Sequence, residues 1–259
     1  MVAAQASMVA ASLPSSQVTP LACPLLPPRL PHNPVSLKFS VLQLKEILLD
    51  GNASHPSGAS HGIGTETCRV LALRGVQVVM GVRNTSSGAC VREVIVRQIP
   101  TAKIEVLELD LSSMSSVRRF VKNFNALNMP PEHSDVRIAF VPFELSEDGI
   151  EMHFATNHLG HFLLTDLLLE KIKVTAKESD IEVRIVIVSS EGIISTIGKF
   201  ILKGVDQGAA TICYLALHPK VAGVTGKYFI DCNAIDPIFP ATDKELAKRL
   251  WDFSVNLVQ

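Results

Sequence analysis

The chain carries a glycine-rich segment whose spacing suits the binding of a phosphate group. Gly58, Gly62 and Gly64 stand in a GxxxGxG pattern directly before a stretch with helical spacing. Glycines let a backbone approach a pyrophosphate closely, and a helix N-terminus offers unpaired N–H groups and the positive end of its dipole. The pattern therefore predicts a cradle for the pyrophosphate of a dinucleotide.

A cation follows at the place where such a fold meets the adenosine ribose. Arg83 comes just after the apolar run Val76–Val82, and a guanidinium there favours a ribose 2′-phosphate, hence NADP over NAD. The alternative is a solvated arginine at a strand end. Asp110, after the next strand, is interpreted either as an adenine contact or as a helix cap. The predicted cofactor-binding residues are Gly58, Ser60, His61, Gly62, Ile63, Gly64, Arg83, Asn84, Asp110 and Leu111.

Strands and helices must alternate to bring these residues together. From residue 58 onward apolar bursts alternate with amphipathic stretches, which is typical of βαβ units. Strands are predicted at Val76–Met80, Ile104–Leu109 and Val183–Val188, with a further one over Val136–Val141. Helices are predicted at Ile63–Arg74, Ser87–Gln98, Ser112–Leu127 (with Ser112 as N-cap) and Glu147–Lys173. The pattern predicts an α/β fold with one doubly wound parallel sheet.

The strand that should lead into the glycine loop is not evident. Residues 52–57 contain Pro56 and no large apolar side chain, so they cannot form a central strand. Val41–Leu49 can take this place only if residues 50–57 form a connection that replaces the usual tight turn.

Composition bounds the remaining possibilities. With 24 basic and 25 acidic residues among 259, the net charge of -1 gives no footprint for nucleic acid. Residues 1–50 are predicted to be an extension and residues 51–259 the cofactor-binding domain. The first 45 residues hold no Asp or Glu and are rich in Ser, Ala and Pro, which favours either a disordered tail or an organelle-targeting segment. Prolines exclude a spanning helix in residues 1–28, and we expect no transmembrane segment. Five scattered cysteines without CxxC spacing predict reduced thiols.

Several motifs in order resemble the short-chain dehydrogenase/reductase family. Besides the glycine loop, they are Asn157-His158-Leu159-Gly160-His161-Phe162 and Ile187-Val188-Ser189-Ser190. Tail segments 207–211, 223–229 and 245–251 are similar to the retinol-dehydrogenase-like branch, and within it to the plant short-chain dehydrogenases of the chloroplast inner-envelope translocon. The resemblance runs from about Gly58 to Leu257. It implies a Rossmann-type domain that moves a hydride between NADPH and a small-molecule carbonyl or alcohol.

The resemblance also implies roles for two catalytic residues. Ser190 would hold the substrate oxygen by a hydrogen bond, and Asn157 would order a water of the proton relay. In the family, a Tyr-x-x-x-Lys pair completes the site. The lysine lowers the pKa of the tyrosine, which then acts as general acid or base.

The chain departs from the family at that pair. His218 lies four residues after Tyr214, and Cys232 lies four residues after Tyr228. We interpret the tyrosine-bearing helix and the strand after it as deleted, as are the family's first strand and its Asn-Asn-Ala-Gly segment. A Tyr214–His218 substitute is the weaker alternative to a tyrosine that packs against the sheet.

Two other features allow alternatives. His158 and His161 share one helix face, as metal ligands can, but ordinary packing is favoured and no metal is expected. The amphipathic stretch Asp243–Val258 suits a partner helix or a calmodulin-type target, although a helix docked on its own sheet is favoured.

Three hypotheses for function remain open. The first is an NADP-linked short-chain oxidoreductase whose activity is lost or strongly reduced, a pseudoenzyme. The second is a non-catalytic component of the chloroplast envelope translocon that binds a nucleotide or a protein. The third is a truncated, non-functional product. The resemblance implies the chloroplast, at the inner envelope or on its stroma side, with the cytoplasm as the alternative.

Overall fold

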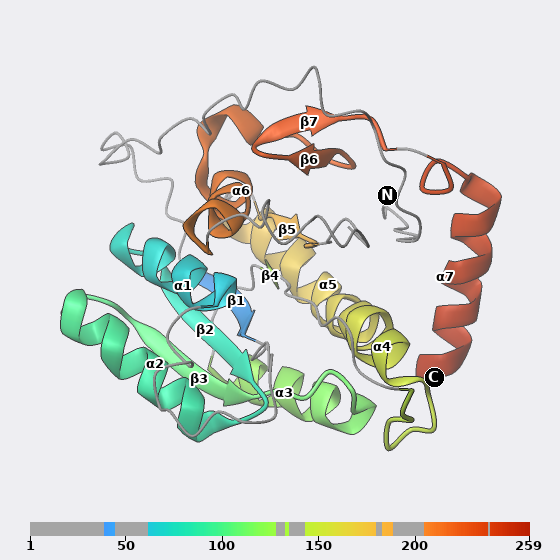
Figure 1. Ribbon diagram of the computed structural model, residues 1–259, viewed down its shortest axis with the longest axis horizontal. Helices are drawn as coiled ribbons and strands as arrows, with labels where there is room; N and C mark the ends of the chain where they lie inside the picture. The colour runs from blue at the N-terminus through green and yellow to red at the C-terminus, as the bar shows by residue number, and fades with distance from the viewer. Residues whose placement is uncertain are drawn as a thin grey trace, which may run out of the picture.

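The chain forms a parallel sheet flanked by helices (Figure 1). The computed structural model describes residues 39–44, 62–127, 133–134, 143–179, 183–188, 205–237 and 239–259. Neighbouring strands of the sheet are parallel and lie in the order β3-β2-β1-β4-β5, which is the order of a doubly wound sheet. The predicted fold class is confirmed. The strands are β1 (Phe39–Leu44), β2 (Gln77–Val82), β3 (Ile104–Glu108), β4 (His133–Ser134) and β5 (Ile185–Val186).

The central strand of the sheet comes from the segment that composition assigned to the extension. β1 pairs with β2 from Phe39↔Gln77 to Leu44↔Val82, and it pairs with β4 on its other side. The expectation that the first strand is deleted is therefore wrong. The alternative, a strand over Val41–Leu49, overlaps β1 at residues 41–44. The sequence between this strand and the glycine loop is longer than a tight turn, and the ladder between β1 and β2 forms nonetheless.

Helices cover both faces of the sheet. α1 (Ile63–Leu73), α2 (Thr85–Gln98) and α6 (Val205–Leu217) pack on one face, while α3 (Met114–Ala126) and α5 (Gly160–Ser179) pack on the other. Side chains of β2 alternate between the two layers, as a pleated strand requires. Val78, Met80 and Val82 lie in the core on the α1 side, and Val79 lies in the core on the α3 side.

The start of α3 differs from the prediction by one residue. Ser113 is the N-cap, and its Oγ accepts a hydrogen bond from Ser116 N at 3.1 Å. Ser112 was the predicted cap, but its N and Oγ donate to Asp110 Oδ1 at 2.9 and 2.6 Å. The Asp110 carboxylate thus holds Ser112 in a turn, and the helix begins after it.

The long predicted helix over 147–173 is interrupted. It consists of the short α4 (Met152–Phe154), a π-helical turn η1 (Ala155–Leu159) and α5, which continues to Ser179. The strand predicted at Val136–Val141 lies outside the described residues.

The C-terminal part adds a hairpin and a last helix. After the short η3 (Pro219–Val221), β6 (Tyr228–Ile230) and β7 (Asn233–Ile235) pair with each other in an antiparallel sheet of their own. α7 (Lys244–Val258) ends the chain at the edge of the molecule (Figure 1). No helix within the described ranges is both long and apolar enough to cross a membrane.

The cysteines follow the prediction only in part. Cys68 of α1 and Cys213 of α6 are buried free thiols, and Cys90 is an exposed one. Burial raises the pKa of Cys213 to about 12 and also raises the pKa of Cys68, so neither thiol ionises near neutral pH. Cys232 is disulfide-bonded, so the prediction of a reduced thiol is wrong there.

Gly160 provides a test of the packing of α5. A Cβ at this position would lie 2.2 Å from Leu111 O and 2.8 Å from Leu111 Cβ. We expect Gly160→Ala to lower the free energy of unfolding by about 1–3 kcal/mol, because backbone must move to relieve this overlap. Urea unfolding measures the change. Gly62→Ala is the matched control, since a Cβ there meets nothing within 4 Å; an equal loss in both variants would contradict the packing argument.

Candidate functional site

The predicted cofactor residues that the structure describes follow the strands at one edge of the sheet. Because β1, β2 and β3 are parallel, their carboxyl ends meet at the same edge. Arg83 follows β2 and Asp110 follows β3, while Gly62 begins the helix that comes after β1 in the chain. Gly58, Ser60, His61 and the predicted catalytic Ser190 lie outside the described residues.

The N-terminus of α1 has no side-chain cap and leaves room for a ligand atom to approach the backbone. Its N-cap is Gly62, in an extended conformation and with no side-chain cap. A Cβ at Gly62 would meet nothing within 4 Å, so the backbone there borders open space. Ile63 packs on the other side against Gly208 of α6, where a Cβ would lie 2.7 Å from Ile63 Cδ1. Gly64 is buried in the first turn of α1, and a pyrophosphate contact at this helix end stays a prediction.

Arg83 and Asn84 play different parts after β2. The Asn84 side chain caps α2, and its Oδ1 accepts from Ser86 N at 3.0 Å and from Ser87 N at 3.1 Å. Arg83 is exposed at the sheet edge. Of these two side chains, only that of Arg83 is therefore not already used as a helix cap and can contact an adenosine ribose or its phosphate.

Asp110 and Leu111 form the turn that follows β3. Asp110 is half-buried, and besides holding Ser112 it donates from its backbone N to Ser116 Oγ at 3.0 Å. The Leu111 side chain is 1% exposed and lies in the core with α3 and α5. The helix-cap interpretation of Asp110 is wrong, because Ser113 caps α3 and the Asp110 carboxylate accepts from Ser112. The adenine contact stays a prediction. Leu111 can contact a ligand only through its backbone.

Asn157 lies in the π-helical η1, three residues before Gly160. η1 continues directly into α5, whose first residue Gly160 sits against Leu111. The Asn157 side chain is half-buried. π-helical turns are rare and occur often at functional sites, because they displace a side chain from its α-helical position. The sequence motif located Asn157 but gave no signal for this turn.

The loop before Asn157 is anchored to the start of α3. Asp148 Oδ2 accepts a hydrogen bond from Met114 N at 2.9 Å, and Ser113 Oγ donates to Glu147 Oε1. Two carboxylates thus lie at the N-terminus of α3, where the helix dipole favours negative charge. These contacts tie the entry of the Asn157 helix to the turn after β3.

Glu151 caps the entry of that helix. Its Oε1 accepts from His153 N at 3.0 Å, and its Oε2 accepts from Phe154 N at 2.8 Å. His153 Nδ1 lies 2.8 Å from Glu151 Oε1. The backbone hydrogen bond from His153, followed by that from Phe154, lowers the pKa of Glu151 below its ordinary value of 4.5.

Tyr214 and His218 pack against each other at the end of α6. Tyr214 is 7% exposed in α6, and its ring packs on the His218 ring with centroids 4.7 Å apart. Desolvation lowers the pKa of His218, with smaller contributions from Lys220 and Arg184, so the imidazole stays neutral at pH 7. A neutral ring supplies no fixed positive charge, which favours the packed tyrosine over the substitute pair.

The surroundings of two histidines on the Asn157 helix could not be predicted from sequence. His158 Nε2 lies 2.8 Å from Ser254 Oγ of α7, and the His161 side chain is 6% exposed in α5. Within the described ranges, no cluster of three or more His, Cys, Asp or Glu side chains is placed to hold a metal. A contact across 96 positions of sequence leaves no local pattern that could reveal it.

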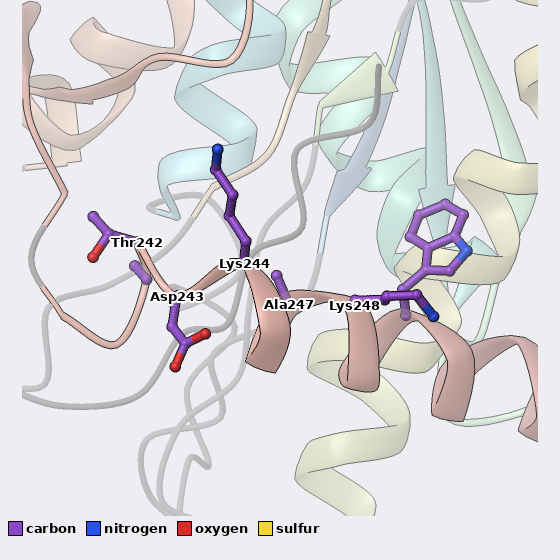
Figure 2. Close-up of a pocket in the computed structure, with 7 residues that line it drawn as sticks. Thr242, Asp243, Lys244, Ala247 and Lys248 are labelled. Atoms are coloured by element: carbon purple, nitrogen blue, oxygen red, sulfur yellow. The ribbon is translucent and has the colours of Figure 1, made fainter.

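A groove follows the first turns of α7, away from the predicted residues. In Figure 2, Lys244 projects from the helix on the side opposite to the Asp243 carboxylate. Of the predicted cofactor and catalytic residues that the structure describes, none lines the groove. It is lined by Ala241, Thr242, Asp243, Lys244, Ala247, Lys248 and Trp251.

Comparison with known proteins assigns the family. The family model for short chain dehydrogenases matches residues 57–198. Short-chain dehydrogenase TIC 32 B, a chloroplastic protein of Brassica napus, is 39% identical over 278 residues, covering 78% of this chain and 87% of the relative. This chain belongs to the short-chain dehydrogenase family. The resemblance inferred from the motifs is confirmed.

More distant relatives agree with this assignment. Human retinol dehydrogenase 11 is 28% identical over 282 residues, which cover 82% of this chain and 87% of that protein. A crystal structure of an uncharacterised protein from Mycobacterium paratuberculosis superposes with a TM-score of 0.55 at 22% identity, over 85% of this chain and 93% of that one. The latter shows a shared fold only.

The alignment with TIC 32 B also contains gaps in this chain. The aligned 78% of 259 residues amounts to about 202 residues, whereas the alignment runs over 278. About 76 positions, the difference between 278 and 202, therefore have no counterpart here.

Glu151 gives the site a testable pH dependence. A carboxyl group whose pKa is lowered by folding stabilises the fold above its ordinary pKa of 4.5, and this contribution is lost as the pH falls through the lowered value. We expect Glu151→Gln to be less stable than wild type at pH 7, and the difference to shrink as the pH falls below about 4.5. Urea unfolding between pH 7 and pH 3 measures it. Glu178→Gln, an exposed change in α5, is the control; a difference for Glu151→Gln that is constant with pH would contradict the assignment.

Proposed function

We propose that this short-chain dehydrogenase binds NADPH and has lost most of the catalytic power of its family. The observation that carries the proposal is that neither tyrosine has a lysine four residues later, since His218 follows Tyr214 and Cys232 follows Tyr228. A positioned general acid or base contributes about 10² to 10⁴ in rate. Without it, a carbonyl oxygen that receives a hydride lacks its proton source.

Cofactor binding is supported by the part of the cradle that the structure describes. The first turn of α1 presents backbone N–H groups beside Gly62, which borders open space. The exposed guanidinium of Arg83 would pair with a ribose 2′-phosphate. NADPH bound there would supply the hydride for a carbonyl substrate, while Gly58, Ser60 and His61 would complete the backbone cradle.

The substrate side is proposed from the family resemblance. Ser190 would hold the oxygen of a small carbonyl or alcohol, and Asn157 would order a relay water. Asn157 lies in η1, three residues before the Gly160 that packs against Leu111, which supports this role. The two residues bind and orient a substrate, but neither supplies the proton that the missing tyrosine would give.

A non-catalytic role in the chloroplast envelope is the second candidate. The observation that favours it is the 39% identity to TIC 32 B, whose name places that protein in the chloroplast. We infer a chloroplast location for this chain on the same ground, at the inner envelope or its stroma side. In this role the retained fold would bind a translocon protein, and nucleotide binding would regulate or stabilise it.

A truncated product is the third candidate. The gaps in the alignment with TIC 32 B support it, because they indicate deletions in this chain. About 76 unmatched positions, 278 aligned less about 202 in this chain, are enough for the tyrosine-bearing helix and its strand. A product that cannot fold would give no cooperative unfolding transition, which separates it from the first two candidates.

We expect purified protein to reduce retinal or another aldehyde with NADPH at least about 10²-fold more slowly than a retinol dehydrogenase assayed alongside. The loss of NADPH absorbance measures turnover. NADPH should at the same time raise the melting temperature, because it binds the folded state only. Turnover within tenfold of the reference enzyme would contradict the proposal, and a cooperative melt that NADPH leaves unchanged would contradict NADPH binding.

Arg83 tests the preference for NADPH separately from catalysis. We expect Arg83→Ala to weaken NADPH binding by about tenfold or more, because a charge-assisted hydrogen bond to the 2′-phosphate is lost, and to leave NADH binding unchanged. Fluorescence titration measures both affinities. Arg97→Ala removes an exposed arginine of α2 and is the control. An equal loss of NADH affinity in Arg83→Ala would show that the residue does not read the phosphate.

A further inference from the structure

The last helix, α7, packs against the π-helical turn that contains Asn157. Its Ser254 Oγ lies 2.8 Å from Nε2 of His158, the neighbour of Asn157 in the chain. Phe253 contacts the Phe154 ring, with centroids 6.0 Å apart. Trp251 meets the Phe162 ring edge-on at 4.9 Å. α7 therefore touches the Asn157 helix before, within and after the π-helical turn.

The hydrogen bond between Ser254 and His158 has a defined direction. Ser254 Oγ donates to Leu250 O of its own helix at 2.7 Å. A hydroxyl has one hydrogen, so the same oxygen accepts the second bond, and His158 Nε2–H donates it. Ser254 is 0% exposed. A fully buried hydroxyl engaged on both sides holds its partner in one place.

A stack of rings extends this contact along the helix. The His158 ring lies between Phe154 and Phe162, with centroid distances of 5.0 and 6.1 Å. The stack keeps the imidazole in the orientation that reaches Ser254. A change in the helical register between residues 154 and 162 would break both the stack and the hydrogen bond.

The C-terminal end of α7 is fixed independently. Val258 is 9% exposed and belongs to the core that α3 and α5 share. The Arg118 guanidinium of α3 donates to Val258 O. α7 is thus attached both to the π-helical turn and to the layer beneath it, so it can act as a brace between them.

We propose that Ser254 is a positioning residue: through His158 it holds the π-helical turn in the register that places Asn157 at the turn after β3. Gly160 fixes the other side of this segment against Leu111. A π-helical turn is a rare conformation, and such conformations persist where the surrounding structure fixes them. The inference rests on the role proposed for Asn157 and adds the element that fixes its position.

Amide hydrogen exchange of residues 155–160 tests the proposal without a need for activity. Ser254→Ala removes the acceptor, and His158→Phe removes the donor while it keeps a ring in the stack. We expect each variant to exchange about five- to tenfold faster at these amides, the effect of one side-chain hydrogen bond. The double variant should be no faster than either single one, because both changes remove the same contact. Asn256→Ala, an exposed change on the same helix, is the control and should leave exchange unchanged.

A second readout separates positioning from general stability. The side-chain amide signal of Asn157 in a ¹H–¹⁵N NMR spectrum should shift in Ser254→Ala and His158→Phe and stay in place in Asn256→Ala. Unchanged exchange at 155–160, or exchange that rises equally throughout α3 and α5, would overturn the proposal. If Ser254→Ala does not fold, His158→Phe carries the test. If NADPH does not bind the wild type while both variants still speed exchange at residues 155–160, the proposed function is contradicted. The positioning role of Ser254 is then supported.

Discussion

The distance between Gly160 and the backbone of Leu111 sets the position of the candidate site. A methyl group on Gly160 would lie 2.2 Å from Leu111 O, so the start of α5 can lie against the turn after β3 only without a side chain. Asn157 precedes Gly160 by three residues and is carried to the same place. The Asp148–Met114 and Glu151 contacts then hold the entry of the helix, and α7 holds its outer side.

The helix that carries Asn157 is thus held by several contacts, while the family's Tyr-x-x-x-Lys pair is not present in the sequence. Arg184, just before β5, connects the sheet to the end of α6. Its guanidinium donates to the Leu215, Ala216 and His218 carbonyl oxygens at 3.1, 3.3 and 3.2 Å, and so caps the end of α6. β6 and β7, by contrast, pair with each other and, among the strands described, with no strand of the main sheet. Both features fit a chain that lost an internal stretch and kept the elements on either side of it.

Local sequence pattern was sufficient wherever an element is regular and has one buried face. Periodicity placed α1, α2, β2 and β3 within a few residues, because their apolar side chains repeat with the period of the element. It failed for β1, since nothing local reveals that residues 39–44 pair with a strand more than thirty positions away. It also failed for the π-helical turn, whose cause lies in contacts with Leu111 and α7.

The candidate site likewise contains features that local sequence predicts and contacts that it does not. The glycine pattern could be found from sequence because a stretch with helical spacing follows it, and Arg83 because it follows a recognisable strand. The docking of α7 was expected on the sheet, but the helix contacts η1 and α5 instead, through Ser254 and Trp251. Such a contact depends on tertiary geometry and is invisible until the fold is known.

The central claim is that a dinucleotide-binding scaffold persists here without a proton donor beside the substrate. A crystal structure with NADPH and a carbonyl analogue tests it most directly. We predict a hydrogen bond from Ser190 to the carbonyl oxygen, and no tyrosine, lysine or histidine of this chain or a second copy within about 3.2 Å of that oxygen. Such a side chain at hydrogen-bonding distance would contradict the account.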